Sequence, residues 1–125
     1  MIIIDGKDYQ IGTLSTQDAF NLARKLSRAT GIIDALLDPD NEGKDRTMLM
    51  LMAFGALDDA TSKAAIDLCM KAVTVHQEAV WARIVDPTGN LMFSDIGVST
   101  MMILAIKVIE ENLGDFFRTA LGAIR

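Results

Sequence analysis

An acidic stretch near the middle of the chain offers the oxygen ligands that calcium prefers. Asp38, Asp40 and Glu42 have the spacing of the first ligands of an EF-hand loop, and Gly43 falls where such a loop turns sharply. The bidentate glutamate that closes the loop would fall on Leu49, which carries no oxygen ligand. We therefore expect these acids to stay solvated, and we predict no calcium site.

The chain has one cysteine and one histidine, Cys69 and His76. On a continuous helix their spacing would put them two turns apart on one face, about 10 Å along the axis. That separation is too long for a thiolate–imidazole pair, and no second Cys or His is present to complete a zinc site. We expect Cys69 to be a small buried hydrophobe and His76 to lie at the edge of the core.

Two pairs of adjacent acids are the remaining candidates for catalysis. Neighbouring helical residues point in different directions, so we interpret Asp58-Asp59 as helix-capping residues and Glu110-Glu111 as a solvated face. The sequence has no glycine-rich phosphate loop, dinucleotide fingerprint or nucleophile elbow. These observations favour a protein that is not an enzyme and needs no cofactor.

The first elements along the chain are predicted from local signals. Two β-favouring runs flank Asp5-Gly6, so residues 2–11 are predicted to form a β-hairpin. Ser15 is a predicted N-cap, and apolar residues at helical spacing follow it as far as Leu36 or Leu37. We expect one long helix there, with Gly31 as its weak point. The segment Asp38–Asp45 is predicted to be a loop.

The rest of the chain is predicted to alternate helices with a second hairpin. A helix is expected from Arg46 to Leu57 with Asp45 as its cap, and another starts at Asp59 or Thr61. The apolar stripe of that later helix is expected to run through Ile66, Cys69, Met70, Val73 and Val80. A second hairpin is predicted from the β-compatible runs 80–85 and 90–93, which flank the turn residues Asp86–Gly89.

A last helix, capped by Ser94, Asp95 or Ser99, completes the predicted fold, and Gly114 is a point where it could divide. The expected fold class is mainly α, with four to five helices in a small bundle and one or two short β-hairpins. Residues 1–125 are expected to form a single domain. Whether the hairpins join in one sheet is left open.

Composition and charge limit the classes of partner that the protein could bind. Half of the residues are apolar, and the net charge of −5 disfavours nucleic acid and anionic membrane surfaces. No apolar run approaches the ~20 residues that span a bilayer, and no signal peptide is visible. With a lone cysteine, this pattern is typical of a soluble protein of a reducing cytoplasm.

The apolar content is unusually high for a small domain, and it concentrates in runs 48–54 and 101–106. Methionine side chains are flexible and polarisable, and they suit surfaces that must fit irregular helical partners. We predict that the first run lines a groove for an amphipathic helix; packing wholly within the core is the alternative. The predicted partner-binding residues are Met48, Met50, Met52, Phe54, Met101 and Met102.

Several segments resemble one protein family in order and spacing. They are Lys7-Asp-Tyr-Gln-Ile-Gly-Thr-Leu14 with residues 19–26, Trp81, Gly89-Asn-Leu-Met-Phe-Ser-Asp-Ile96, and Val108-Ile-Glu-Glu-Asn-Leu-Gly-Asp-Phe-Phe117. In these segments the chain resembles tail assembly chaperones of tailed bacteriophages.

The resemblance implies a non-catalytic protein that coats the tape measure protein in the host bacterial cytoplasm. Such a chaperone would keep the tape measure protein soluble until the tail tube assembles and would be absent from the mature virion. The tail tube protein is a second candidate partner. Self-association into a homo-oligomer through the same apolar surface is also expected. The alternative that we weigh is a small helical adaptor or regulatory subunit of a cytoplasmic complex.

Overall fold

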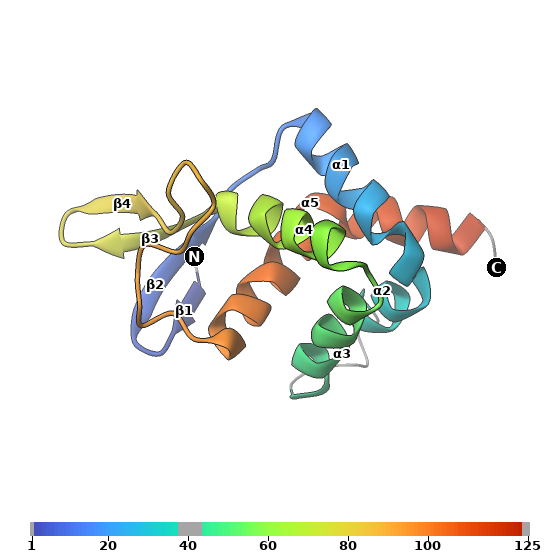
Figure 1. Ribbon diagram of the computed structural model, residues 1–125, viewed down its shortest axis with the longest axis horizontal. Helices are drawn as coiled ribbons and strands as arrows, with labels where there is room; N and C mark the ends of the chain where they lie inside the picture. The colour runs from blue at the N-terminus through green and yellow to red at the C-terminus, as the bar shows by residue number, and fades with distance from the viewer. Residues whose placement is uncertain (1, 38–43, 124–125) are drawn as a thin grey trace.

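The computed structural model describes residues 2–37 and 44–123, and its strands form one antiparallel sheet. The described strands follow the order β1-β2-β3-β4, and five of the described helical segments are inserted in the chain between β2 and β3. Figure 1 shows this sheet at one end of the molecule and the helices at the other. The strands are β1 (Ile2–Ile4), β2 (Lys7–Ile11), β3 (Val73–Gln77) and β4 (Val80–Arg83).

The described residues combine helices with a four-stranded antiparallel sheet, which makes the fold mixed α/β. The prediction of a mainly α fold with one or two separate hairpins is therefore wrong. The two hairpins share a sheet because β2 pairs with β3, Tyr9 opposite Val75 and Ile11 opposite Val73. The helical segments are α1 (Thr16–Leu26), η1 (Ser27–Ala29), α2 (Thr30–Leu37), α3 (Lys44–Gly55), α4 (Asp59–Lys71) and α5 (Val98–Ala123).

The turn and the helix cap that were predicted near the N-terminus are both present. Asp5 and Gly6 both adopt positive φ, at 50° and 77°, and they turn β1 into β2. The Ser15 hydroxyl accepts a hydrogen bond from the backbone N–H of Asp18 at 3.1 Å, which caps α1. The predicted hairpin and the predicted cap are both confirmed.

The expected single helix from Ser15 to Leu37 is interrupted earlier than predicted. The chain leaves the α-helix at Ser27–Ala29, a 3₁₀ segment, whereas Gly31 lies inside α2. The Ser27 hydroxyl donates to the carbonyl of Arg24 at 2.7 Å. A serine side chain that bonds a carbonyl of the preceding turn competes with the helical ladder, and such bonds often bend helices. Of the predicted loop Asp38–Asp45, residues 38–43 lie outside the described residues. Lys44 and Asp45 belong to α3, so the predicted cap at Asp45 is wrong.

The second hairpin lies before the predicted position. Helix α4 ends at Lys71, and β3 pairs with β4 across a turn in which Glu78 has a φ of 55°. The predicted pairing around Asp86–Gly89 amounts to one bridge, between Val85 and Leu91. The expectation that the apolar stripe of α4 continues to Val80 is therefore wrong, because residues 73–77 are a strand.

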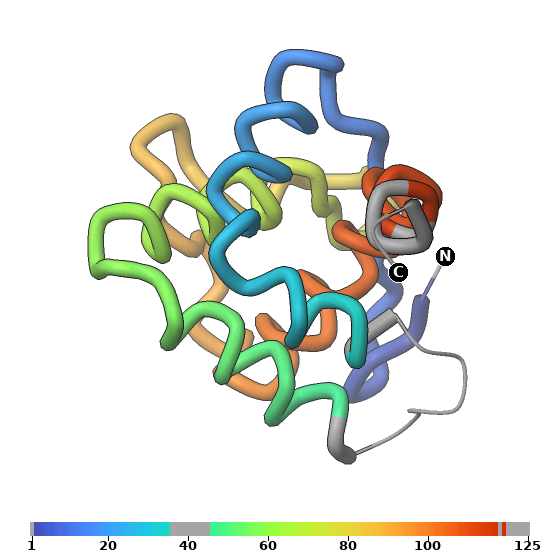
Figure 2. Tube along the Cα trace, turned by 90° about the vertical axis from the view of Figure 1, so that its right-hand side faces the viewer, coloured from blue at the N-terminus to red at the C-terminus, as the bar shows by residue number. Residues whose placement is uncertain are grey.

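Helix α5 packs against most of the other elements of the fold. It runs unbroken through Gly114 and packs against α2, α3 and α4 as well as β2 (Figure 2). Its fully buried side chains include Leu104, Val108 and Ile109. Because α5 contacts both the sheet and the other helices, the sheet and the helices share one core.

Two polar contacts fasten neighbouring elements to α5. The Asn112 side chain accepts from the backbone N–H of Leu14 at 2.8 Å and donates to the carbonyl of Gly12 at 3.2 Å. This clamp holds the link between β2 and α1. The Arg46 guanidinium donates to the Glu110 carboxylate, and both side chains are largely buried, so α3 is tied to α5.

Candidate functional site

Helix α3 divides the predicted apolar run into a buried side and an exposed side. Met50, Ala53 and Phe54 are 0%, 0% and 4% exposed and belong to the core. Met48, Leu51 and Met52 are 58%, 52% and 51% exposed. Since residues three and four apart share one side of a helix, these exposed side chains form a continuous apolar ridge, which we call the α3 face.

The helix that carries the α3 face is held in place by contacts with its neighbours. Helix α3 packs against α2 and α5, and the ion pair between Arg46 and Glu110 joins its first turns to α5. The prediction that Glu110 lies on a solvated face is therefore wrong for its side chain, which is 25% exposed. The position of the ridge is therefore set by the packing of α3 against the core.

The six predicted partner-binding residues do not share one environment. Met48 and Met52 lie on the α3 face, whereas Met50 and Phe54 point into the core beneath it. On α5, Met102 is 3% exposed and Met101 is partly buried against the core. Leu51 was missed as a site residue, although its spacing from Met48 and Met52 places it between them on the helix surface.

Exposed apolar side chains also occur away from α3. Large ones that are more than half exposed include Phe20 on α1, Val80 on β4, Met92 before α5 and Phe116 on α5. Trp81 is 42% exposed, and its ring lies 5.0 Å from the ring of His76 across the β3–β4 hairpin. The α3 face differs from these sites because it gathers several such side chains on one short helix.

Cys69 and His76 lie in unrelated environments. Cys69 is fully buried on α4, and this burial raises the pKa of its thiol to about 12. A protonated thiol is a poor nucleophile and a poor metal ligand. His76 is exposed on strand β3, so the helical geometry predicted for this pair does not apply. Across residues 2–37 and 44–123, no cluster of His, Cys, Asp and Glu could hold a metal ion.

The remaining acid pair has a structural role that the sequence predicted. The Asp58 carboxylate accepts from the backbone N–H of Thr61 at 2.7 Å and caps α4. The hydrogen bonds from Thr61 lower the pKa of Asp58, because they stabilise its charged form. The calcium candidates Asp38, Asp40 and Glu42 lie outside the described residues.

Two of the hollows on the surface of the described residues are lined by residues of α1 and α4 rather than by the α3 face. The larger has a volume of about 620 Å³ and the smaller about 300 Å³, and Arg24 and Lys25 line both. The prediction that residues 48–54 line a groove is not supported by either hollow. No helix among the described residues is long and apolar enough to cross a bilayer.

Comparison with known proteins shows which protein family the chain matches. The model of the family described as "Phage tail assembly chaperone protein, TAC" matches residues 5–124. No curated protein and no solved structure matches the chain. A family match over nearly the whole length favours the chaperone interpretation over the adaptor alternative. The chain belongs to the phage tail assembly chaperone family.

Proposed function

We propose that this chaperone binds apolar helical segments of the tape measure protein through the α3 face. The observation that carries the proposal is the exposure of Met48, Leu51 and Met52 by more than half on a helix whose opposite side is buried in the core. Exposed apolar ridges of this kind are used by proteins that bind amphipathic helices. Family membership supports a partner among the tail proteins.

The chemistry of the ridge suits a long partner with many similar sites. Methionine and leucine make no directional bonds, so one ridge fits different apolar stripes along the tape measure protein. Each Å² of apolar area that is covered contributes roughly 25 cal/mol, but association costs offset much of that gain. Binding at each site is therefore reversible, and the growing tail tube displaces the chaperone by covering the same stripes.

Because binding is reversible, the chaperone can be released during tail assembly. We propose that it works in the host bacterial cytoplasm and leaves before the virion is complete. Without a partner, the α3 face of one copy would cover that of another and form a weak homo-oligomer. Sedimentation velocity over a dilution series would detect this self-association, and a strict monomer at every concentration would contradict it.

Co-expression tests the proposed activity directly. The tape measure protein of the same phage is expressed alone, with the wild-type chaperone, or with a chaperone carrying Met48→Gln, Leu51→Gln and Met52→Gln. We expect the wild type to increase the soluble fraction of the tape measure protein and the variant to lose that increase. Equal solubility with and without the wild-type chaperone would refute the proposal.

A further inference from the structure

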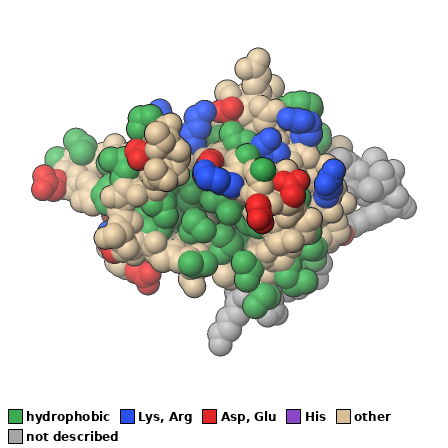
Figure 3. Space-filling model, viewed as in Figure 1, with side chains coloured by type: hydrophobic (Ala, Val, Ile, Leu, Met, Phe, Trp, Pro, Cys, Tyr) green, Lys and Arg blue, Asp and Glu red, His purple; other side chains and the backbone are tan. Residues whose placement is uncertain are grey.

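The larger surface hollow is a groove between α1, α4 and the segment that follows β4. Its floor contains the apolar side chains of Ala64, Leu68 and Val85, and its rim carries Arg24, Lys25 and Arg83. In the space-filling view, hydrophobic side chains occupy a hollow near the centre, with basic side chains beside it (Figure 3). We call this feature the α1–α4 groove.

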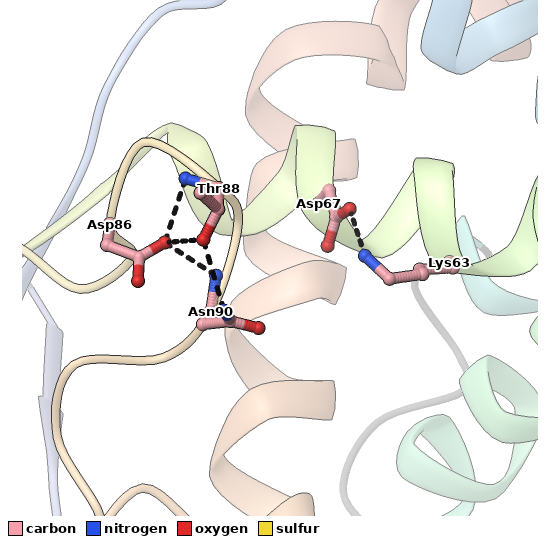
Figure 4. Close-up of polar contacts among 5 residues, drawn as sticks. All are labelled: Lys63, Asp67, Asp86, Thr88 and Asn90. Carbon is pink, nitrogen blue, oxygen red and sulfur yellow. Dashed lines mark hydrogen bonds and ion pairs between the residues drawn. The ribbon is translucent and has the colours of Figure 1, made fainter.

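One wall of the groove is a turn that is held in shape by its own hydrogen bonds. The Asp86 carboxylate accepts from the backbone N–H and the hydroxyl of Thr88, at 2.8 and 2.6 Å, and from the N–H of Asn90 at 3.0 Å (Figure 4). Gly89 has a φ of 89°, and a Cβ there would lie 3.2 Å from the Asp67 carboxyl carbon. The wall is therefore preformed against α4.

The charge of the groove is opposite to that of the whole chain. Arg24, Lys25, Lys71 and Arg83 line it against the acids Asp67 and Asp86, whereas the net charge of the chain is −5. Asp67 is paired with Lys63, and Asp18 is paired with Lys71. The hydrogen bonds within its own turn lower the pKa of Asp86 and stabilise its charge locally.

An apolar floor beside clustered cations defines the chemistry of the occupant. We propose that the α1–α4 groove binds an acidic amphipathic helix of the partner, whose apolar side chain enters the groove while carboxylates beside it pair with Arg24, Lys25 and Arg83. The volume of about 620 Å³ gives room for more than one side chain. The acids in the lining disfavour a run of phosphates, so a protein helix fits better than nucleic acid.

This inference rests on the proposed function, and it deepens that function by defining a second contact and the charge of the segment that makes it. The α3 face selects apolar stripes without regard to charge, whereas the groove would select stripes flanked by Asp or Glu. Such a contact would fix which segments of the partner are covered, and salt would weaken it.

A pair of synthetic helical peptides tests the proposal on the full chain. One carries leucines at helical spacing flanked by glutamates, and the other has glutamine at each glutamate position. Binding is measured by fluorescence anisotropy at low and high salt. We expect the glutamate peptide to bind about tenfold tighter at low salt, since several exposed ion pairs of modest strength add up, and the advantage to shrink at high salt.

Variants locate the site. Arg24→Glu combined with Lys25→Glu should abolish the preference for the glutamate peptide, and Ala64→Met should weaken both peptides by filling the floor. Lys107→Glu, a single charge reversal on α5 outside the lining, should leave both affinities unchanged. Thermal melts of each variant, followed by circular dichroism, check folding.

Two results would overturn the proposal: equal binding of both peptides, or a preference that survives Arg24→Glu with Lys25→Glu. Tighter binding of a single-stranded oligonucleotide, or self-association lost in the same variant, would also overturn it by assigning the groove to another occupant. The chaperone could fail to bind the tape measure protein and still prefer the glutamate peptide in a way that depends on Arg24. In that case the proposed function is refuted and the groove proposal stands. If groove variants leave tape measure binding intact while α3-face variants abolish it, the groove proposal alone fails.

Discussion

Replacing Met48, Leu51 and Met52 together by glutamine is expected to weaken tape measure binding strongly without unfolding the chaperone. These side chains are 58%, 52% and 51% exposed, so a partner that covers them buries about half of each. Full burial of such a side chain is worth about 1.5–3 kcal/mol, and half of it about 0.8–1.5 kcal/mol. The three together then contribute about 2.4–4.5 kcal/mol, or a roughly 60-fold to 2,000-fold change in Kd.

The affinity of a tape measure fragment for wild type and variant is measured by isothermal titration calorimetry. The matched control is Met92→Gln, because Met92 is 59% exposed in the segment before α5 and is not on the α3 face. We expect this control to bind as the wild type does. A triple variant that binds within a factor of about two of the wild type, well under 1 kcal/mol, would refute the assignment of the α3 face.

Other perturbations test the fold that supports this face. Asn112→Ala removes the partners of the backbone segment 12–14 and should lower the free energy of unfolding by about 1–3 kcal/mol in urea titrations; an unchanged midpoint would contradict the clamp. Ser15→Ala removes the cap that accepts from Asp18 and should cost about 1 kcal/mol in the same assay, and a neutral effect would argue against it. Cys69 should react with a disulfide reagent only on unfolding, because burial raises its pKa to about 12 from 9.0. The unfolded thiol loses its proton first, so stability should fall as pH rises from about 9 towards 12, and a Cys69→Ala variant should lack this dependence.

Features that depend on a few neighbouring residues could be predicted from the sequence. The Asp5-Gly6 turn needs positive φ, and the caps at Ser15 and Asp58 need one short side chain with an oxygen acceptor. Each of these requirements is satisfied within a few positions along the chain. Local hydrogen bonding therefore determined them before any tertiary contact was known.

The sheet depends on contacts between distant residues, and the sequence pattern alone could not place it. Val73 fits both the apolar stripe of α4 and the alternation of a strand, in which Val73 and Val75 share the buried face. Pairing with Tyr9 and Ile11 decides between them, and those residues lie far away along the chain. A helical stripe that continues past Lys71 was therefore a reasonable prediction that tertiary pairing overrode.

The candidate site could be predicted only in part for a related reason. A run that is apolar on every side, from Met48 to Phe54, indicates more apolar surface than one side of a helix needs for its own core contacts. It does not indicate which side faces inwards. The packing of α3 against α2 and α5 decides that Met50 and Phe54 are buried, and that Met48 and Met52 are exposed.

Methyl NMR of the labelled methionines is the most direct test of the α3 face. A helical segment of the tape measure protein is titrated into chaperone whose eight methionine methyl groups are labelled. The account predicts that the Met48 and Met52 signals shift and saturate with the binding curve, while exposed Met92 and buried Met102 hold their positions. Binding that leaves Met48 and Met52 unchanged would contradict the account.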